Sequence, residues 1–277
     1  MDIERSWVMD ENVIFALLLT LFAGLATGIG SLLSLLTSRT NTKFLSVALG
    51  FSAGVMIYVS LVEIFVKAKD ALVVELGATN GYWMTIVGFF GGMIFIAAID
   101  RLLPKLGNPH EVKSVEDMDV EPSNAEYTKL MKMGVFTALA VGIHNFPEGI
   151  ATFMSALQDP NLGIAIAIAV AIHNIPEGIA VAVPIYYATG SRKKAFKLSF
   201  LSGLAEPIGA FLAYLILMPY LNGVMFGVVF AAVAGIMVFV SLDGLLPAAK
   251  KYDEAHSSIY GVIAGMMVMA ISLVLLA

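Results

Sequence analysis

The sequence contains no cysteine and few charged residues. Asp, Glu, Lys and Arg make up 13% of its 277 residues, whereas 59% are hydrophobic and the mean hydropathy is +0.88. The lack of cysteine excludes disulfides, thiolate metal sites and thiol catalysis, so a metal site must use nitrogen and oxygen ligands. The scarcity of charge excludes an ordinary soluble domain, and the scattered basic residues offer no surface for nucleic acid.

Long apolar runs dominate what is present. A helix that crosses a hydrocarbon core of about 30 Å needs roughly 20 apolar residues. Eight runs of about this length predict an all-α integral membrane protein with eight transmembrane helices in a single domain, residues 1–277. The expected spans are residues 13–36, 44–66, 82–103, 133–157, 162–187, 195–217, 224–246 and 259–276.

The basic residues predict how these spans lie in the membrane. Eight spans place both termini on one side, which holds three of the sixteen Lys and Arg residues, and the other side holds thirteen. Since short cytoplasmic loops are rich in Lys and Arg, we expect both termini outside, in a cell inner membrane or plasma membrane. The N-terminus is net acidic, so we expect the first span to be retained rather than cleaved as a signal. We expect residues 104–128, which include His110, to form an acidic cytoplasmic linker.

Two internal repeats relate the spans to one another. Residues 144–151 (HNFPEGIA) and 173–180 (HNIPEGIA) share seven of eight positions at an offset of 29. The connection between them is too short to recross the membrane, so the fourth and fifth helices are antiparallel and their motifs meet near the midplane. Residues 52–65 and 233–246 share six of fourteen positions. This weaker match predicts that helices 1–3 and 6–8 form an inverted repeat around the central pair, which is typical of alternating-access transporters.

The duplicated motif carries groups that bind metals. His144 and Glu148, and likewise His173 and Glu177, lie four residues apart and therefore share one face of a helix. Glu206 lies at the same depth in the sixth span. Each ionised group at the bilayer centre costs roughly 2.5–3.5 kcal/mol, and no Lys or Arg lies at that depth, so protons or a metal must compensate. The histidines favour a metal.

Simpler roles stay open for some of these residues. The His/Glu pairs could form a satisfied polar cluster that joins helices, and Glu206 alone could bond a neighbouring carbonyl. Asn145 and Asn174 are either oxygen ligands of a second ion or interhelical hydrogen bonds. Glu63 and Asp243, near the ends of their spans, would suit an entrance and an exit, although solvation at an interface also explains them. Asp100, beside Arg101, is better explained as an interfacial ion pair.

The paired His-Asn-X-Pro-Glu-Gly motifs, with Gly-Leu-Ala-Glu at residues 203–206, resemble the ZIP family of metal transporters, and closely its prokaryotic ZupT-like branch. The resemblance implies eight helices and import of zinc, ferrous iron and related divalent ions, often by a homodimer. It also implies a binuclear centre in which Glu148 and Glu177 bridge two ions. One ion would bind His144, Glu148, His173 and Glu177, and the other would bind Asn145, Glu148, Asn174, Glu177 and Glu206.

The chain departs from the family pattern in places. Asp243 is followed by Gly244, where relatives often have Asp-Glu, and the loop before the fourth helix has no histidine-rich cluster. We therefore expect a transporter rather than an enzyme, with no catalytic cofactor and with divalent ions and the lipid bilayer as partners. Zinc, ferrous iron, manganese, cobalt and cadmium all suit the ligands. The alternatives are an intramembrane metal-dependent hydrolase and a passive metal channel with the same ligands.

Overall fold

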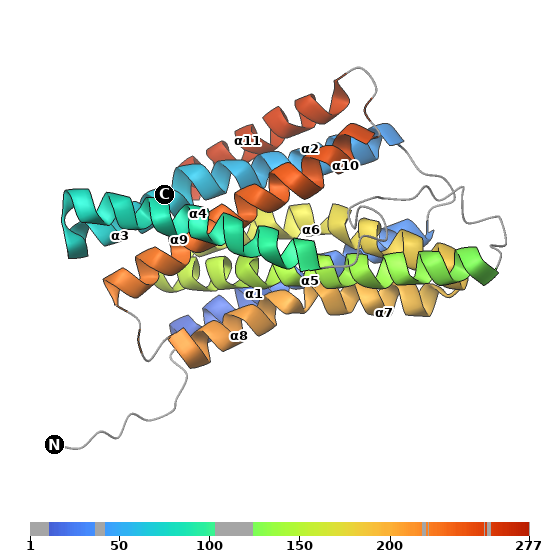
Figure 1. Ribbon diagram of the computed structural model, residues 1–277, viewed down its shortest axis with the longest axis horizontal. Helices are drawn as coiled ribbons and strands as arrows, with labels where there is room; N and C mark the ends of the chain where they lie inside the picture. Colours follow the sequence, from blue (N-terminus) through green and yellow to red (C-terminus); the bar gives the residue numbers. More distant parts are fainter. Residues whose placement is uncertain are drawn as a thin grey trace.

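The computed structural model describes residues 11–36, 42–102, 124–217, 220, 222–251, 253 and 256–276, and these residues form an all-helical protein (Figure 1). Its helices are α1 (Glu11–Leu36), α2 (Thr42–Tyr58), η1 (Val59–Ile64), α3 (Phe65–Leu76), α4 (Ala78–Leu102), α5 (Asn124–Gln158), α6 (Pro160–Thr189), α7 (Arg192–Gly203), α8 (Ala205–Leu217), α9 (Gly223–Val240), η4 (Ser241–Leu245), α10 (Leu246–Lys251) and α11 (Ser257–Leu276). The short elements η1 and η4 are π-helical turns inside longer helices.

Seven of the described helical segments are long and apolar enough to cross a membrane. They comprise α1, α2 to α3, α4, the Pro160–Val183 part of α6, α7 to α8, α9 to α10, and most of α11. The 35-residue helix α5, which corresponds to the expected fourth span, is not among them. The structure therefore supports a multi-pass membrane protein.

Helices α5 and α6 form an antiparallel hairpin, as the short connection between the motifs predicts. Asp159 starts α6, because its Oδ1 accepts hydrogen bonds from the N–H groups of Asn161 (2.9 Å) and Leu162 (3.4 Å). Pro160 occupies the first turn, where its missing N–H costs nothing. The two halves of the duplicated motif are therefore carried on neighbouring helices that run in opposite directions.

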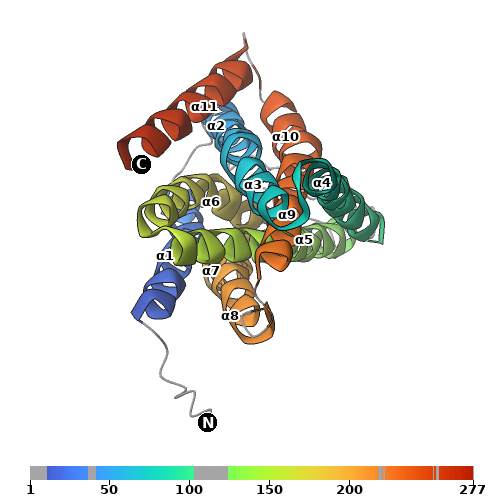
Figure 2. The ribbon, with the colours of Figure 1, turned by 90° about the vertical axis from the view of Figure 1, so that its left-hand side faces the viewer.

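The helices form two packed groups (Figure 2). In the first group, which we call the motif bundle, α1 packs on α6, and α5 packs on α6, α7 and α8. In the second group, which we call the flanking bundle, α2 packs on α11, and α9 packs on α3 and α4. The first span, α1, and the sixth span, α7 to α8, both belong to the motif bundle, and the inverted repeat of helices 1–3 and 6–8 stays a prediction.

The weaker repeat is accompanied by a shared backbone irregularity. The π-helix η1 lies inside the segment 52–65, and η4 lies inside the matching segment 233–246. Ser60 and Ser241 are equivalent positions in the repeat, and both are buried. The helices that contain them run in opposite directions in Figure 1. Two segments that match in sequence thus share the same departure from α-helical geometry.

Two expected boundaries were wrong, and one expected span contains an interruption. The second span continues to Leu76 because Lys67, Lys69 and Asp70 lie on the outer side of a helix whose Ala68 and Leu72 are fully buried. The charged residues therefore mark the exposed face of a continuing helix and not its end.

The expected linker 104–128 ends early, because residues 124–128 belong to α5. Its other acidic residues and His110 lie outside the described residues. The sixth span is interrupted at Leu204, between α7 and α8. Pro207 explains the interruption, since it has no N–H to donate to the carbonyl of Gly203.

Candidate metal centre

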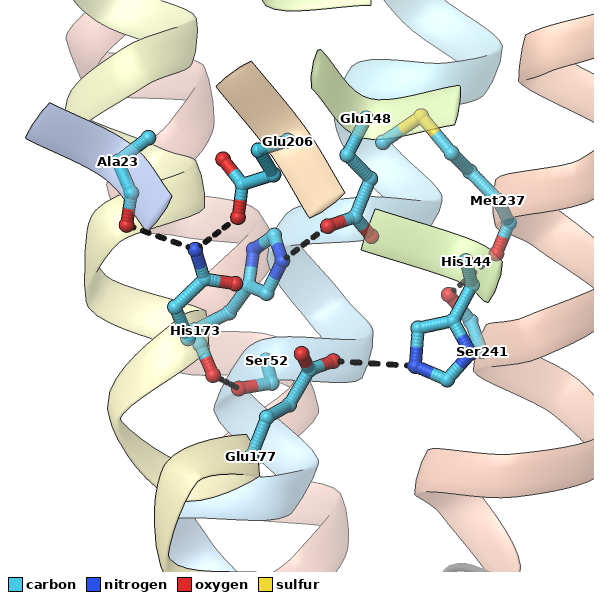
Figure 3. A network of polar contacts seen from close by, with 10 residues as sticks. Ala23, Ser52, His144, Glu148, His173, Glu177, Glu206, Met237 and Ser241 are labelled. Atoms are coloured by element: carbon cyan, nitrogen blue, oxygen red, sulfur yellow. Dashed lines mark hydrogen bonds and ion pairs between the residues drawn. The ribbon is translucent and has the colours of Figure 1, made fainter. Parts of the chain in front are cut away.

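All seven expected metal ligands meet inside the motif bundle. Helix α5 carries the first motif and α6 carries the second, and the first turn of α8 contributes Glu206 directly after the interruption at Leu204 (Figure 3). Their exposed fractions lie between 0 and 4%. These residues are His144, Asn145, Glu148, His173, Asn174, Glu177 and Glu206. The structure thus brings together every side chain that the sequence assigned to the centre.

The two motifs are paired across the helices and not within them. His173 Nε2 lies 3.2 Å from Glu148 Oε2, and His144 Nε2 lies 3.8 Å from Glu177 Oε1. Each histidine therefore faces the carboxylate of the other motif, although the spacing along one helix would group it with its own. This reciprocal exchange is the arrangement expected of two copies related by a two-fold axis.

Each asparagine donates to a carboxylate on another helix, although only Asn145 reaches the opposite motif. Asn174 donates from Nδ2 to Glu206 Oε1 and to the carbonyl of Ala23 (2.8 Å). In the amide orientation that satisfies both its oxygen and its nitrogen, Asn145 donates to Glu177 Oε2 (3.1 Å) and to the carbonyl of Val141 (2.8 Å). Both interactions are interhelical hydrogen bonds to expected ligands, one of the two roles left open by the sequence.

Several ligand atoms have no hydrogen-bond partner among the described residues. Glu148 Oε1, Asn174 Oδ1 and Glu206 Oε2 are all buried and unsatisfied. Leaving such atoms unpaired inside a protein costs roughly 1–3 kcal/mol each, more for charged groups. One ligand atom from each of Glu148, His173 and Glu177 lies within 4.8 Å of the other two. Ligands at about 2.1 Å from a tetrahedral zinc ion are roughly 3.4 Å apart, so small side-chain adjustments would let these three bind one ion.

The motif glycines allow the helices to approach at the centre. A Cβ atom on Gly149 would lie 2.0 Å from the carbonyl oxygen of Glu206, and one on Gly178 would lie 2.0 Å from that of Thr27. Only glycine permits these contacts, which press α5 against α8 and α6 against α1. Gly149 therefore sets the position of Glu206 relative to the His/Glu cluster.

A small pocket extends from the cluster towards two further carboxylates. It has a volume of about 30 Å³ and is lined by His144, Asp100 and Asp243, among others. Asp243, which the sequence suggested for an exit, thus shares this pocket with His144. Asp100, which the sequence assigned to an interfacial ion pair with Arg101, also faces this pocket. Its position on α4 relative to η4 depends on tertiary packing, which the sequence pattern does not reveal.

Glu63 lies apart from this pocket. It belongs to the π-helix η1, and its Oε1 lies 3.6 Å from Lys67 Nζ. Its side chain is 20% exposed. The helix continues for thirteen residues beyond it, to Leu76, so Glu63 does not mark the end of its helix. It stays a prediction for an entrance.

The flanking bundle adds groups that the sequence did not single out. Ser52 on α2 donates from Oγ to the carbonyl of His173 (3.3 Å). Ser241 donates to the carbonyl of Met237 (2.8 Å), and Figure 3 shows Met237 on the side of Glu148. Ser52 and Ser241 both belong to the weaker repeat, which is the sequence feature that could have identified them. Ser52 thus links the flanking bundle directly to the backbone of the second motif.

Comparison with known proteins identifies the family of this chain. A family model described as ZIP zinc transporter matches residues 105–273. A protein named zinc transporter ZupT from Lysinibacillus sphaericus is 75% identical over 268 residues, which are 97% of this chain and 100% of that protein. The proteins of that name from Oceanobacillus iheyensis and Streptococcus mutans are 71% and 58% identical over 267 residues. Each alignment covers 96% of this chain, together with 100% of the Oceanobacillus protein and 99% of the Streptococcus protein.

Proposed function

The chain belongs to the ZIP family of metal transporters, and from this premise we propose that it carries divalent transition-metal ions into the cytoplasm through the buried centre of the motif bundle. The observation that carries the proposal is the convergence of two histidines, three glutamates and two asparagines from α5, α6 and α8 in a site with unsatisfied ligand atoms. The chain is a transporter and not an enzyme, and the metal is its cargo.

The centre has enough ligands for two adjacent ions. The first ion would bind His144, Glu148, His173 and Glu177, whose Glu148, His173 and Glu177 atoms already lie within 4.8 Å of one another. The second would use Glu206 with the oxygens of Asn145 and Asn174, and Glu148 and Glu177 would bridge the two ions. This assignment requires both amides to turn their oxygens towards the ion and to give up their present hydrogen bonds. Nitrogen and carboxylate ligands suit zinc, ferrous iron, manganese and cobalt, and zinc is the cargo named for the relatives.

The two bundles supply a moving frame for alternating access. All seven expected ligands belong to the motif bundle, so an ion can keep its ligands while that bundle moves against the flanking bundle. The boundary between the bundles consists of fewer packed elements than either interior, chiefly α2 against α6 and α5 against α9. Movement at this boundary would open the centre first to one side of the membrane and then to the other.

The orientation follows from the basic residues. Arg101, Lys193 and Lys250 lie at helix ends on one side of the molecule, and we place this side in the cytoplasm, with the termini outside, in the cell inner membrane or plasma membrane. The pocket with Asp100 and Asp243 extends from the centre towards that side and would serve as the exit. Entry would pass Glu63 on the opposite half of the molecule.

Uptake of radioactive zinc by proteoliposomes tests the proposal directly. We expect saturable uptake that the double variant His173→Ala/Glu177→Ala abolishes, whereas Glu75→Gln, an exposed change on α3, leaves it intact. Intact transport by the double variant would refute the site. Uptake that rises linearly with zinc, without saturation, would identify a passive channel. Competition by iron, manganese, cobalt and cadmium, with and without an imposed proton gradient, would rank the cargoes and reveal the coupling ion.

A further inference from the structure

A large apolar groove lies on the side of the molecule, outside the metal centre. Its volume is about 590 Å³, within the range of roughly 300–1,000 Å³ typical of pockets that hold a small molecule. Phe95, Val135, Leu139 and Leu201 line it and are 40 to 60% exposed, so the groove opens at the surface. These residues lie in expected membrane spans. The groove, which we call the lateral groove, therefore opens towards lipid.

The lateral groove lies on the boundary between the two bundles. Phe95 and Ile99 of α4 and Ile236 of α9 form the wall on the flanking bundle. The opposite wall comes from α7, and the floor from α5, both in the motif bundle. An occupant would contact both bundles at once. Any relative movement of the bundles would change the shape of its site.

The floor of the groove is also the outer side of the metal centre. Ile143, Phe146 and Pro147 line it, and they alternate along α5 with the expected ligands His144 and Glu148. The motif helix is therefore in contact with the groove on one face and with the cluster on another.

Exposed basic residues flank the groove-lining segments of α7 and α4. Lys194 and Lys197 are exposed on α7, and each lies one turn before a groove residue, Leu198 or Leu201. Arg101 is exposed at the end of α4, two residues after Ile99.

Two acidic groups of the described residues lie near the same end. Asp100 and Asp243 line the small pocket beside His144. The three basic groups named above outnumber these two, which favours an anionic group at this end of the groove. Under the orientation proposed above, this end lies in the cytoplasmic leaflet, where anionic lipids attract basic residues.

We propose that the lateral groove binds an anionic phospholipid, with an acyl chain along α5 and the phosphate against the basic residues of α7 and α4. The hydrocarbon of the acyl chain suits the apolar lining of the groove, and the negative phosphate suits the basic residues at one end. The occupied groove bridges the two bundles, so the lipid also sets the rate at which they move. This last part rests on the proposed function, whereas lipid binding does not.

Native mass spectrometry of the full-length protein in detergent tests binding, with dioleoyl phosphatidylglycerol and dioleoyl phosphatidylcholine as probes. Wild type should retain phosphatidylglycerol more strongly. The variant Lys194→Gln/Lys197→Gln should weaken that retention by about fivefold for each lysine lost and leave phosphatidylcholine unaffected. The matched variant Lys43→Gln/Lys250→Gln removes two exposed lysines elsewhere and should change neither lipid.

Filling the groove tests the chain site separately. Gly142 lines the groove, and a Cβ atom there meets nothing closer than 3.9 Å, so Gly142→Leu places a side chain in the cavity. Gly142→Leu should no longer retain either lipid. Ala138→Phe fills the groove from another position and should have the same effect, so the test does not depend on one variant folding correctly. The control Gly91→Leu makes the same change at an exposed glycine of α4 outside the groove and should retain both.

Three results would overturn the binding site: equal retention of the two lipids by wild type, unchanged retention in both groove variants, or a shift from dimer to monomer in Gly142→Leu with lipid retained. The last result would identify a second copy of the chain as the occupant.

Zinc uptake in liposomes with and without phosphatidylglycerol then tests the coupling. Phosphatidylglycerol should change the rate of zinc uptake by wild type and leave the rate of Gly142→Leu unchanged. A wild-type uptake rate that does not depend on this lipid would refute the coupling but not the lipid-binding site. No zinc uptake in any liposome, with the retention pattern intact, would refute the proposed function and leave the lipid site standing.

Discussion

The contact between Gly149 and Glu206 gives a sharp test of how the centre is held together. Replacing Gly149 by Ala would place a Cβ atom 2.0 Å from the carbonyl oxygen of Glu206, whereas ordinary contacts begin at 3.4 Å. Relieving the overlap requires α5 and α8 to separate by about 1.4 Å, the difference between these two distances. Because the oxygen is backbone, no side-chain rotation can absorb this shift, and Glu206 moves away from the cluster with its helix.

The expected cost has two parts. Overpacking of a tight interior lowers the free energy of unfolding by roughly 1–3 kcal/mol. Displacing a functional group by about 1 Å lowers rates by up to roughly a hundredfold. We therefore expect Gly149→Ala to lower the thermal stability in detergent and to reduce zinc uptake per folded molecule by one to two orders of magnitude.

The matched control is Gly142→Ala on the same helix. Its Cβ atom meets nothing closer than 3.9 Å, so the gain in helix propensity is the same and the overlap is absent. Thermal melts, zinc binding by calorimetry and proteoliposome uptake should be measured for both variants. Equal uptake and equal zinc affinity in the two variants would refute the role assigned to this contact.

Three further predictions concern the ligands and one helix start. Glu177→Gln should weaken zinc binding by more than the roughly 10–100-fold typical of outer-shell partners, since Glu177 contacts both His144 and Asn145, and calorimetry with an unchanged affinity would contradict this. Zinc uptake should fall as external pH drops from about 7 to about 5.5, because histidine must lose its proton before it binds metal; a flat profile would exclude proton competition. Hydrogen bonds from the side chain and N–H of Ser258 lower the pKa of Asp253 below its usual 3.8, so its stabilisation of α11 is present at neutral pH and lost as pH falls through the lowered value. Hydrogen exchange at the start of α11 should therefore be faster in Asp253→Asn than in wild type at neutral pH, and a persistent difference in strong acid would argue against this cap.

The sequence predicted the composition of the centre better than its geometry. Ionisable groups are rare in apolar helices, so a duplicated motif at mid-span and Glu206 stand out without any structure. The crossed pairing of His144 with Glu177 and of His173 with Glu148 was not predictable in this way. The spacing of four residues describes only one helix, whereas the pairing depends on how two helices pack.

Errors in the fold have a similar cause. The composition of the sequence predicts that the second span ends before Lys67, but Ala68 and Leu72 continue a buried face. The packing of α1 against α6 depends on contacts such as that of Gly30 with the backbone of Ile175, which no periodic pattern encodes. The length of the second helix and the packing of α1 therefore depend on long-range contacts, which local sequence patterns do not reveal.

The π-helix η1 has a consequence for how the second long helix is aligned along its length. A π-turn holds one residue more than an α-helical turn, so the faces beyond it would be out of phase if the same residues of Val59–Ile64 formed regular α-helix. Everything beyond it would then turn by about 100°, the rotation per residue at 3.6 residues per turn. Ala68 and Leu72 would leave the face that packs on α9, while Leu49 and Met56 on the other side of the turn would stay in place. The π-turn therefore acts as a phase correction, which lets one continuous helix present aligned buried faces before and after Val59–Ile64.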